Sequence, residues 1–128
     1  MPLRTYIIED NAVIRENLAD TLEELAAVAV IGYAETETEA REWLLENIQG
    51  WDLAIVDLFL KEGSGIGVLE ACRDRNENQK MVVLSNYATR DVRSRCMALG
   101  VDAVFDKSNE IEDLVDFCLA HGDALGNP

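Results

Sequence analysis

The sequence is poor in basic residues. Lysine and arginine together number 11, against 25 aspartate and glutamate residues, which gives a formal net charge of −14. A surface this negative repels nucleic-acid backbones and anionic lipid headgroups, because binding either one requires neutralising cations. We therefore expect no direct binding to nucleic acid or membrane. Divalent cations and basic patches on other proteins are the partners that this charge favours.

The sequence also lacks a secretory signal, a membrane-spanning run and an even set of cysteines. Residues 1–10 have neither a basic start nor a long apolar run. No apolar stretch approaches the roughly 20 residues that a membrane span needs. The three cysteines, Cys72, Cys96 and Cys118, lie far apart in helical patterns. This arrangement favours buried thiols in a reducing cytosol over metal or redox chemistry, so a cytoplasmic protein is expected.

What the chain does have is a regular alternation of two patterns over 128 residues, 48% of which are hydrophobic. Short runs rich in β-branched residues alternate with segments of helical period. The runs predict strands at Arg4–Ile8, Val28–Ala34, Leu53–Asp57, Met81–Ser85 and Ala103–Asp106. The periodic segments predict helices at Ala12–Leu25, Glu37–Ile48, Thr89–Leu99 and Ile111–Leu119, and another that is capped by Ser64 and carries Ile66, Leu69 and Cys72 inward.

Apolar strands that do not alternate with polar residues are typical of a parallel sheet covered on both faces. With short right-handed connections, the pattern predicts an α/β fold, a doubly wound, flavodoxin-like sheet of five strands in the order 2-1-3-4-5 with five helices. Residues 1–128 are expected to form one domain without an output domain, since little follows the last helix. His121 is expected to lie near a frayed end and to be inert.

Charged and hydroxyl side chains follow four of the five predicted strands. Glu9 and Asp10 follow the first strand, Asp57 ends the third, Ser85 ends the fourth and Lys107 follows the fifth. Open α/β sheets bind ligands outside the carboxyl ends of their strands, so these side chains are expected to converge at one edge. Each residue alone could be a turn residue or a solvated charge. Their joint occurrence at the strand ends favours a functional site.

The residue types in this set suit phosphoryl transfer. Clustered carboxylates repel one another, and Mg²⁺, which prefers oxygen ligands, relieves that repulsion. An aspartate beside the ion can act as a nucleophile toward phosphorus. The outer oxygens of the transferred phosphoryl group carry negative charge, which the Lys107 ammonium and the Ser85 hydroxyl can stabilise.

On these residues the sequence resembles the receiver domain of two-component response regulators over essentially its whole length. The matching segments are YIIEDN, LAIVDLFL with the following GSG, VVLSNYA and GVDAVFDKS. The resemblance implies that Asp57 accepts a phosphoryl group from a histidine kinase or a histidine phosphotransfer protein. It also implies signalling through contacts with a downstream protein effector. Such a chain is a switch that gains and loses its own phosphoryl group, not a turnover enzyme.

The resemblance also assigns roles around Asp57. It implies that the Mg²⁺ ligands are Asp57 itself, Asp10, the Phe59 carbonyl and, mainly through water, Glu9. Ser85 would move toward the phosphoryl group and Lys107 would pair with it. Recognition of the kinase would fall on the first helix, at Ile14, Arg15 and Leu18, and on the loop after the fifth strand.

Some positions depart from the family pattern. Val104 replaces an aromatic residue that relatives usually carry three positions before the lysine, and Phe105 is expected on the opposite face of the strand. The usual coupling through a turning ring is therefore not expected. Ser108 follows Lys107 where a cis proline is common. Because a non-proline cis bond costs about 2.5–4 kcal/mol, we expect a trans Lys107–Ser108 bond.

Two bulky side chains, Phe59 and Tyr87, lie two residues beyond Asp57 and Ser85. In relatives these positions flank the path of hydrolytic water. One hypothesis is that both rings shield the acyl phosphate and lengthen its lifetime. The alternative is that they only pack on the loops.

Other interpretations stay open. A pseudo-receiver would keep the fold as a binding module without phosphorylation. A metal-dependent aspartyl phosphatase is a further class, but such enzymes usually carry a second aspartate where this chain has Phe59, and without an acid–base partner turnover is not expected.

Basic residues of the fourth helix could meet acidic residues nearby in a weak homodimer, although a solvated face is the favoured interpretation. The basic residues are Arg90, Arg93 and Arg95, and the acidic ones are Asp102, Asp106, Glu112 and Asp116.

Overall fold

A computed structural model describes residues 2–126, in which strands and helices alternate along the chain. The strands are β1 (Leu3–Ile8), β2 (Val28–Ala34), β3 (Leu53–Val56), β4 (Lys80–Ser85) and β5 (Ala103–Asp106). The helices are α1 (Ala12–Leu25), α2 (Glu37–Glu46), α3 (Gly65–Ala71), α4 (Arg90–Ala98) and α5 (Ile111–Gly126). Each predicted element is therefore present, with shifts at some ends.

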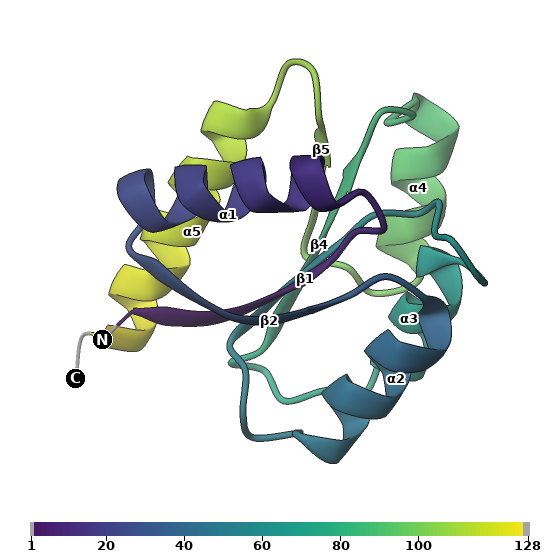
Figure 1. Ribbon diagram of the computed structural model, residues 1–128, viewed down its shortest axis with the longest axis horizontal. Coiled ribbons are helices and arrows are strands. Elements are labelled where there is room, and N and C mark those ends of the chain that lie inside the picture. The colour runs from purple at the N-terminus through teal and green to yellow at the C-terminus, as the bar shows by residue number, and fades with distance from the viewer. Residues whose placement is uncertain (1, 127–128) are drawn as a thin grey trace.

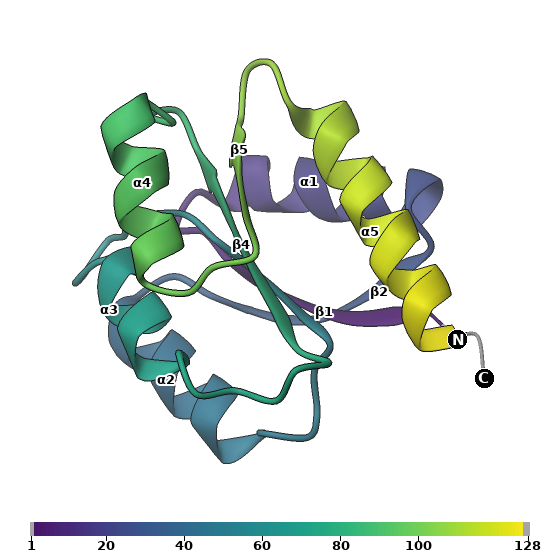
Figure 2. The same cartoon turned by 180° about the vertical axis from the view of Figure 1, so that it is seen from behind.

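The five strands form one parallel sheet in the order β2-β1-β3-β4-β5, which confirms the predicted topology. Helices α1 and α5 cover one face, and α2, α3 and α4 cover the other (Figure 1). Seen from behind, the loops after β4 and β5 leave the sheet at the same edge, at the top of the view (Figure 2). This edge is where the predicted site residues lie.

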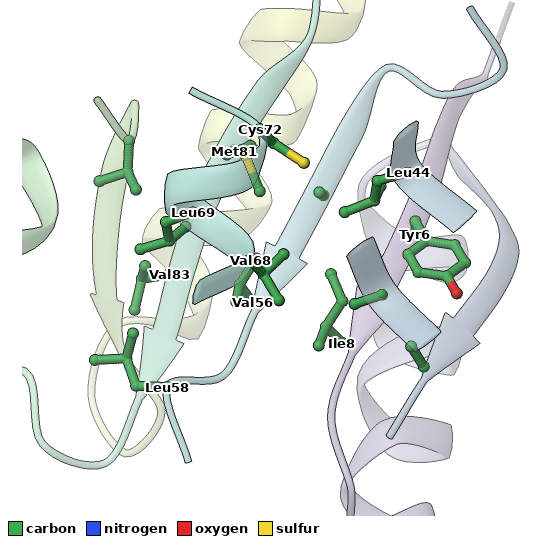
Figure 3. Close-up of a cluster of buried hydrophobic side chains, with 14 of the residues drawn as sticks. Tyr6, Ile8, Leu44, Val56, Leu58, Val68, Leu69, Cys72, Met81 and Val83 are labelled. Carbon is green, nitrogen blue, oxygen red and sulfur yellow. The ribbon is translucent and has the colours of Figure 1, made fainter. Parts of the chain in front are cut away.

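The core has two layers because successive residues of a strand point to opposite faces. On the α2–α4 side, Ile8, Val56 and Val83 pack with residues of the helices, as Figure 3 shows for Leu44, Val68 and Leu69. On the α1–α5 side, neighbouring strand residues pack with Leu18, Leu22, Leu114 and Cys118. Val104 belongs to the first layer and Phe105 to the second, so their predicted placement on opposite faces is confirmed.

Two predicted helix ends are wrong. Helix α2 ends at Glu46 and not at Ile48, because Asn47 caps it: its side-chain Nδ2 donates to the Trp43 carbonyl at 2.9 Å. Ile48, expected on the inner face, is 42% exposed. Helix α5 continues beyond Leu119 to Gly126, and His121 is buried rather than frayed, with Nε2 3.3 Å from the Asp52 carbonyl oxygen.

Other expectations about the backbone and thiols are confirmed. Residues 2–126 contain no cis peptide bond, so the Lys107–Ser108 bond is trans. The three cysteines are free and buried. None of the helices within this range is long and apolar enough to cross a membrane.

Candidate functional site

The sheet's hydrogen bonding continues one residue past the strands and thereby places the site side chains at one edge. The Glu9 N–H donates to the Ala34 carbonyl, and the Asp57 N–H donates to the Ile8 carbonyl, both at 3.0 Å. The Lys107 N–H donates to the Ser85 carbonyl at 3.0 Å. Three neighbouring strand pairs therefore hold these backbones in register, so the convergence predicted from the sequence is found.

The Lys107 ammonium lies between two buried carboxylates. Its Nζ donates to Asp57 Oδ2 at 2.8 Å and to Glu9 Oε1 at 2.5 Å. The side chains of Lys107, Glu9 and Asp57 are only 12%, 4% and 11% exposed. Because burying an unpaired charge is very unfavourable, this ammonium is what allows both carboxylates to be buried in ionised form.

The pKa values of Asp57, Glu9 and Lys107 are shifted from their ordinary values, each by a different balance of burial and hydrogen bonding. Burial raises the pKa of Asp57 above its ordinary value, against the opposing effect of its hydrogen bond to Lys107. Burial also acts to raise the pKa of Glu9, but bonds to Lys107 and to the Asn11 N–H outweigh it, so the pKa of Glu9 is lowered. The pKa of Lys107 is raised, because its hydrogen bonds to Asp57 and Glu9 outweigh burial. Of the two carboxylates that Lys107 contacts, Asp57 is therefore the one whose ionised form is less stabilised.

Asp10 completes a set of oxygen ligands that fits a hard divalent cation. One carboxylate oxygen from each of Glu9, Asp10 and Asp57 lies within 4.8 Å of the others. Two oxygens on opposite sides of a Mg²⁺ ion are about 4.2 Å apart, twice the usual bond length. Burial and the nearby Glu9 carboxylate raise the pKa of Asp10, as expected where three carboxylates face the single ammonium of Lys107. The donors therefore fit Mg²⁺ with small movements.

The loop after β3 approaches Asp57 closely and requires a glycine. A Cβ added at Gly65 would lie 2.2 Å from the Asp57 carbonyl oxygen, so no side chain fits there. The preceding Ser64 caps α3 as predicted, since its Oγ accepts from the Ile66 N–H at 3.0 Å. On the other side of the loop, the Phe59 N–H donates to Asp57 Oδ1 at 3.3 Å.

Ser85 joins the site through its backbone. It is fully buried, and its hydroxyl accepts from the Tyr87 N–H at 3.0 Å. Within the part of the chain that the structure describes, this hydroxyl is not hydrogen-bonded to Asp57 or Lys107. Its predicted role requires it to turn from its own loop toward Asp57.

The Phe59 and Tyr87 side chains meet beside this edge. Their ring centroids are 5.1 Å apart at an interplanar angle of 69°, an edge-to-face contact. Both rings remain exposed, Phe59 by 62% and Tyr87 by 61%. The Phe59 N–H donates to the Asp57 carboxylate, and the Tyr87 N–H donates to the Ser85 hydroxyl. The two rings are therefore attached to the two groups whose contacts are expected to change on phosphorylation.

The sequence predicts a different role for Arg15 and none for Asn11, yet both support the site. Arg15, expected to contact a kinase, donates from Nη1 to the Glu9 carbonyl at 3.0 Å and lies 3.8 Å over the Tyr33 ring centroid. Asn11 caps α1 by accepting from the Ile14 N–H, and an asparagine just before a helix is a recognisable signal. The Arg15 contact has no such signal, because it depends on the packing of α1 against β2.

Comparison with known proteins gives the family. Residues 5–118 match the family described as the response regulator receiver domain, so the chain belongs to that family. It is therefore a receiver domain of two-component signal transduction. It resembles the photosynthetic apparatus regulatory protein RegA of Rhodobacter capsulatus, with 32% identity over 75 residues that cover 59% of this chain and 41% of RegA. It also resembles the transcriptional regulatory protein PhoP of Escherichia coli K12, with 27% identity over 113 residues that cover 88% of this chain and 49% of PhoP.

Solved structures agree on the fold. The signal receiver domain of the response regulator NarL from Mycobacterium tuberculosis superposes with a TM-score of 0.80 at 19% identity, covering 99% of this chain and 98% of that one. A CheX–CheY–BeF₃–Mg²⁺ complex from Borrelia burgdorferi gives a TM-score of 0.81 at 15% identity, covering 100% of this chain and 92% of the other. The chain spans about half the length, or less, of the curated relatives it matches.

Proposed function

We propose that Asp57 is a phospho-acceptor that takes a phosphoryl group, in a Mg²⁺-dependent reaction, from a histidine kinase or a histidine phosphotransfer protein. The observation that carries this proposal is the Lys107 ammonium 2.8 Å from a buried Asp57 carboxylate, with the oxygens of Glu9 and Asp10 close by. An ammonium in contact with Asp57 and a set of carboxylates that can bind a metal ion are what a phosphoryl group on Asp57 requires.

The transfer needs no acid or base of its own. A carboxylate oxygen of Asp57 attacks phosphorus, an O–P bond forms, and the P–N bond to the donor imidazole breaks with its electron pair leaving on nitrogen. When bound by Asp10, Asp57, the Phe59 carbonyl and, mainly through water, Glu9, Mg²⁺ would supply positive charge to the carboxylates and the transferred oxygens. Lys107 then donates to a phosphoryl oxygen, and Ser85 moves from the Tyr87 N–H toward another.

Phosphorylation changes the charge and the contacts of Asp57, which is how the site can signal. Phosphorylation occupies a carboxylate that Lys107 and the Phe59 N–H now hold, so both contacts must rearrange. We propose that the resulting change in the loops alters docking to a downstream protein. The acyl phosphate carries about two negative charges where the carboxylate carries one, and the new charge-assisted contacts that it makes contribute to the shift between the two states.

Intact mass spectrometry tests this proposal. Wild type and Asp57→Asn, which keeps the shape of the side chain, are incubated with acetyl phosphate in Mg²⁺ or in EDTA. We expect one added phosphoryl group on wild type in Mg²⁺, and none on wild type in EDTA or on Asp57→Asn. A wild-type protein that gains none would favour a pseudo-receiver, and equal gain by Asp57→Asn would place the acceptor elsewhere.

The expected absence of nucleic-acid binding concerns this domain alone. It follows from the net charge of −14 over 128 residues. Longer relatives are another matter: PhoP is named a transcriptional regulatory protein, and RcsB of Salmonella enterica has been solved bound to a promoter. A cytoplasmic setting is proposed because the three buried cysteines are unpaired.

A further inference from the structure

The three arginines of α4 have different environments. Arg90 and Arg95 are exposed, and within residues 2–126 their side chains make no hydrogen bond. The Arg93 guanidinium, by contrast, has three partners. Its Nε donates to the Ala88 carbonyl at 2.9 Å and its Nη1 to the Val104 carbonyl at 3.0 Å, while Nη2 forms an ion pair with Glu110.

Glu110 extends this contact into the loop after β5. Its Oε1 also accepts from the Asp106 N–H at 2.9 Å, and its own N–H donates to the Asp106 carbonyl at 2.9 Å. The hydrogen bond from Arg93 and then the one from Asp106 lower the pKa of Glu110. The loop that begins at Asp106 is therefore closed by Glu110, and Arg93 holds Glu110.

The loops that Arg93 joins carry the two groups that stabilise the phosphoryl group. Ala88 lies in the loop that Ser85 begins, and Asp106 directly precedes Lys107. The same loops meet nearer Asp57, where the Lys107 N–H donates to the Ser85 carbonyl. A guanidinium has a rigid fork of donors, so it fixes several acceptors at set distances better than an ammonium does. Arg93 thus fixes the separation of the loops at a second point.

The Val104 side chain does not connect the two loops, so Arg93 makes this connection. Val104 is buried in the core layer with Val83 and Cys96, and it offers no ring that could turn between the loops. What position 104 offers to its surroundings is its carbonyl, which Arg93 binds. We propose that Arg93, acting with Glu110, is a positioning residue that sets Ser85 and Lys107 relative to Asp57, an inference that rests on the phosphoryl transfer proposed above.

The alternative is a structural role only, in which Arg93 covers the outer edge of β5 and anchors α4. The variants Arg93→Ala, Glu110→Ala and the double mutant separate the two roles, with Arg95→Ala as a control on the same helix. The first readout is the initial rate of phosphorylation by acetyl phosphate at saturating Mg²⁺, at a temperature where every variant is folded. The second is the ¹H–¹⁵N resonance of the Lys107 amide, which Arg93 does not touch.

We expect each single variant to lose about tenfold in rate, since misplacing a group by about 1 Å can cost up to about a hundredfold. The double mutant should lose less than the two single losses combined, because both single variants remove the Arg93–Glu110 ion pair. The Lys107 amide should shift in Arg93→Ala, and Arg95→Ala should match wild type in both readouts.

Lower unfolding temperatures with an unchanged rate and an unchanged Lys107 amide would overturn the inference in favour of the structural role. Strictly additive losses in the double mutant would also overturn it. A wild-type protein that accepts no phosphoryl group would refute the proposed function itself, whereas a phosphorylated wild type with an equally fast Arg93→Ala would refute only the positioning role.

Discussion

Replacing Lys107 with methionine should destabilise the metal-free protein strongly. Methionine keeps most of the hydrocarbon stem but removes the ammonium that Asp57 and Glu9 share. The two carboxylates would then face each other and Asp10 without a counter-charge. Because these charges are buried, solvent cannot replace the lost partner.

The size of the effect follows from burial. Removing one partner of a buried ion pair typically costs about 3–5 kcal/mol, and the side chains of this pair are at most 12% exposed. Some of that cost is avoided when a carboxylate takes up a proton. We therefore expect the free energy of unfolding to fall by about 3 kcal/mol at neutral pH, which lowers the melting temperature by roughly 10 °C.

The sign of the pH dependence gives an independent check. In wild type, Lys107 holds the pKa of Glu9 down, so this contribution to stability is present above the ordinary carboxyl pKa and is lost as pH falls. Without Lys107, burial is left to raise the pKa of Glu9. Stability of the variant should then increase as pH falls toward 5, because the folded state takes up protons that the unfolded state does not.

Thermal and urea unfolding in EDTA, between pH 5 and pH 8, measure both effects. Lys61→Met is the matched control, since Lys61 is exposed in the loop after β3, and it should stay within about 0.5 kcal/mol of wild type. Added Mg²⁺ should raise the melting temperature of Lys107→Met more than that of wild type, because it replaces the missing positive charge. If Lys107→Met loses less than about 1 kcal/mol at neutral pH, the ammonium is not what permits the buried carboxylates.

The remaining predictions concern the aromatic pair, the glycine and Asp57. Replacing Phe59 and Tyr87 together with serine should speed loss of the phosphoryl group several-fold, followed by intact mass after the donor is removed; an unchanged half-life would leave the rings a packing role only. Gly65→Ala should lower the free energy of unfolding by about 2 kcal/mol or more, because its Cβ would meet the Asp57 carbonyl oxygen at 2.2 Å. Gly122→Ala, whose Cβ would lie 3.7 Å from Leu3 Cγ in ordinary van der Waals contact, should be neutral or stabilising by up to about 1 kcal/mol. Equal effects of the two substitutions would refute the close approach at Gly65. Burial raises the pKa of Asp57, so the ionised Asp57 carboxylate opposes folding above that pKa. Asp57→Asn should therefore melt higher than wild type at pH 7 in EDTA and lose this advantage near pH 4, where the carboxylate is protonated. A lower melting temperature for Asp57→Asn at pH 7 would contradict this prediction.

The strands and the topology could be predicted because the apolar runs are short, β-branched and regularly spaced. The helix ends were harder. Ile48 fits the helical period of α2, but a local hydrogen bond from Asn47 to Trp43 ends the helix first. The sequence pattern places His121 beyond the last helix, yet it is buried against the Asp52 carbonyl. Both outcomes depend on contacts that hydrophobic periodicity does not encode.

The site could be predicted as a set but not in its connections. Asp57, Glu9, Asp10 and Lys107 follow strand ends, and parallel pairing brings such ends together. The Arg93 and Arg15 contacts could not be foreseen, because an exposed-looking arginine in a helix gives no sign of which carbonyls lie opposite it. On charge alone the sequence groups Arg93 with Arg90 and Arg95, and only the packing of α4 against β5 separates them.

The central claim, phosphoryl acceptance by Asp57, is tested most directly by locating the modified residue. The protein is phosphorylated with acetyl phosphate and Mg²⁺ and then reduced with borohydride, which converts an aspartyl phosphate into homoserine. Peptide mass spectrometry then identifies the converted position. We expect homoserine at position 57 alone, and none when Mg²⁺ is omitted. Homoserine at position 10 or at another carboxylate, or no conversion in Mg²⁺, would contradict the account.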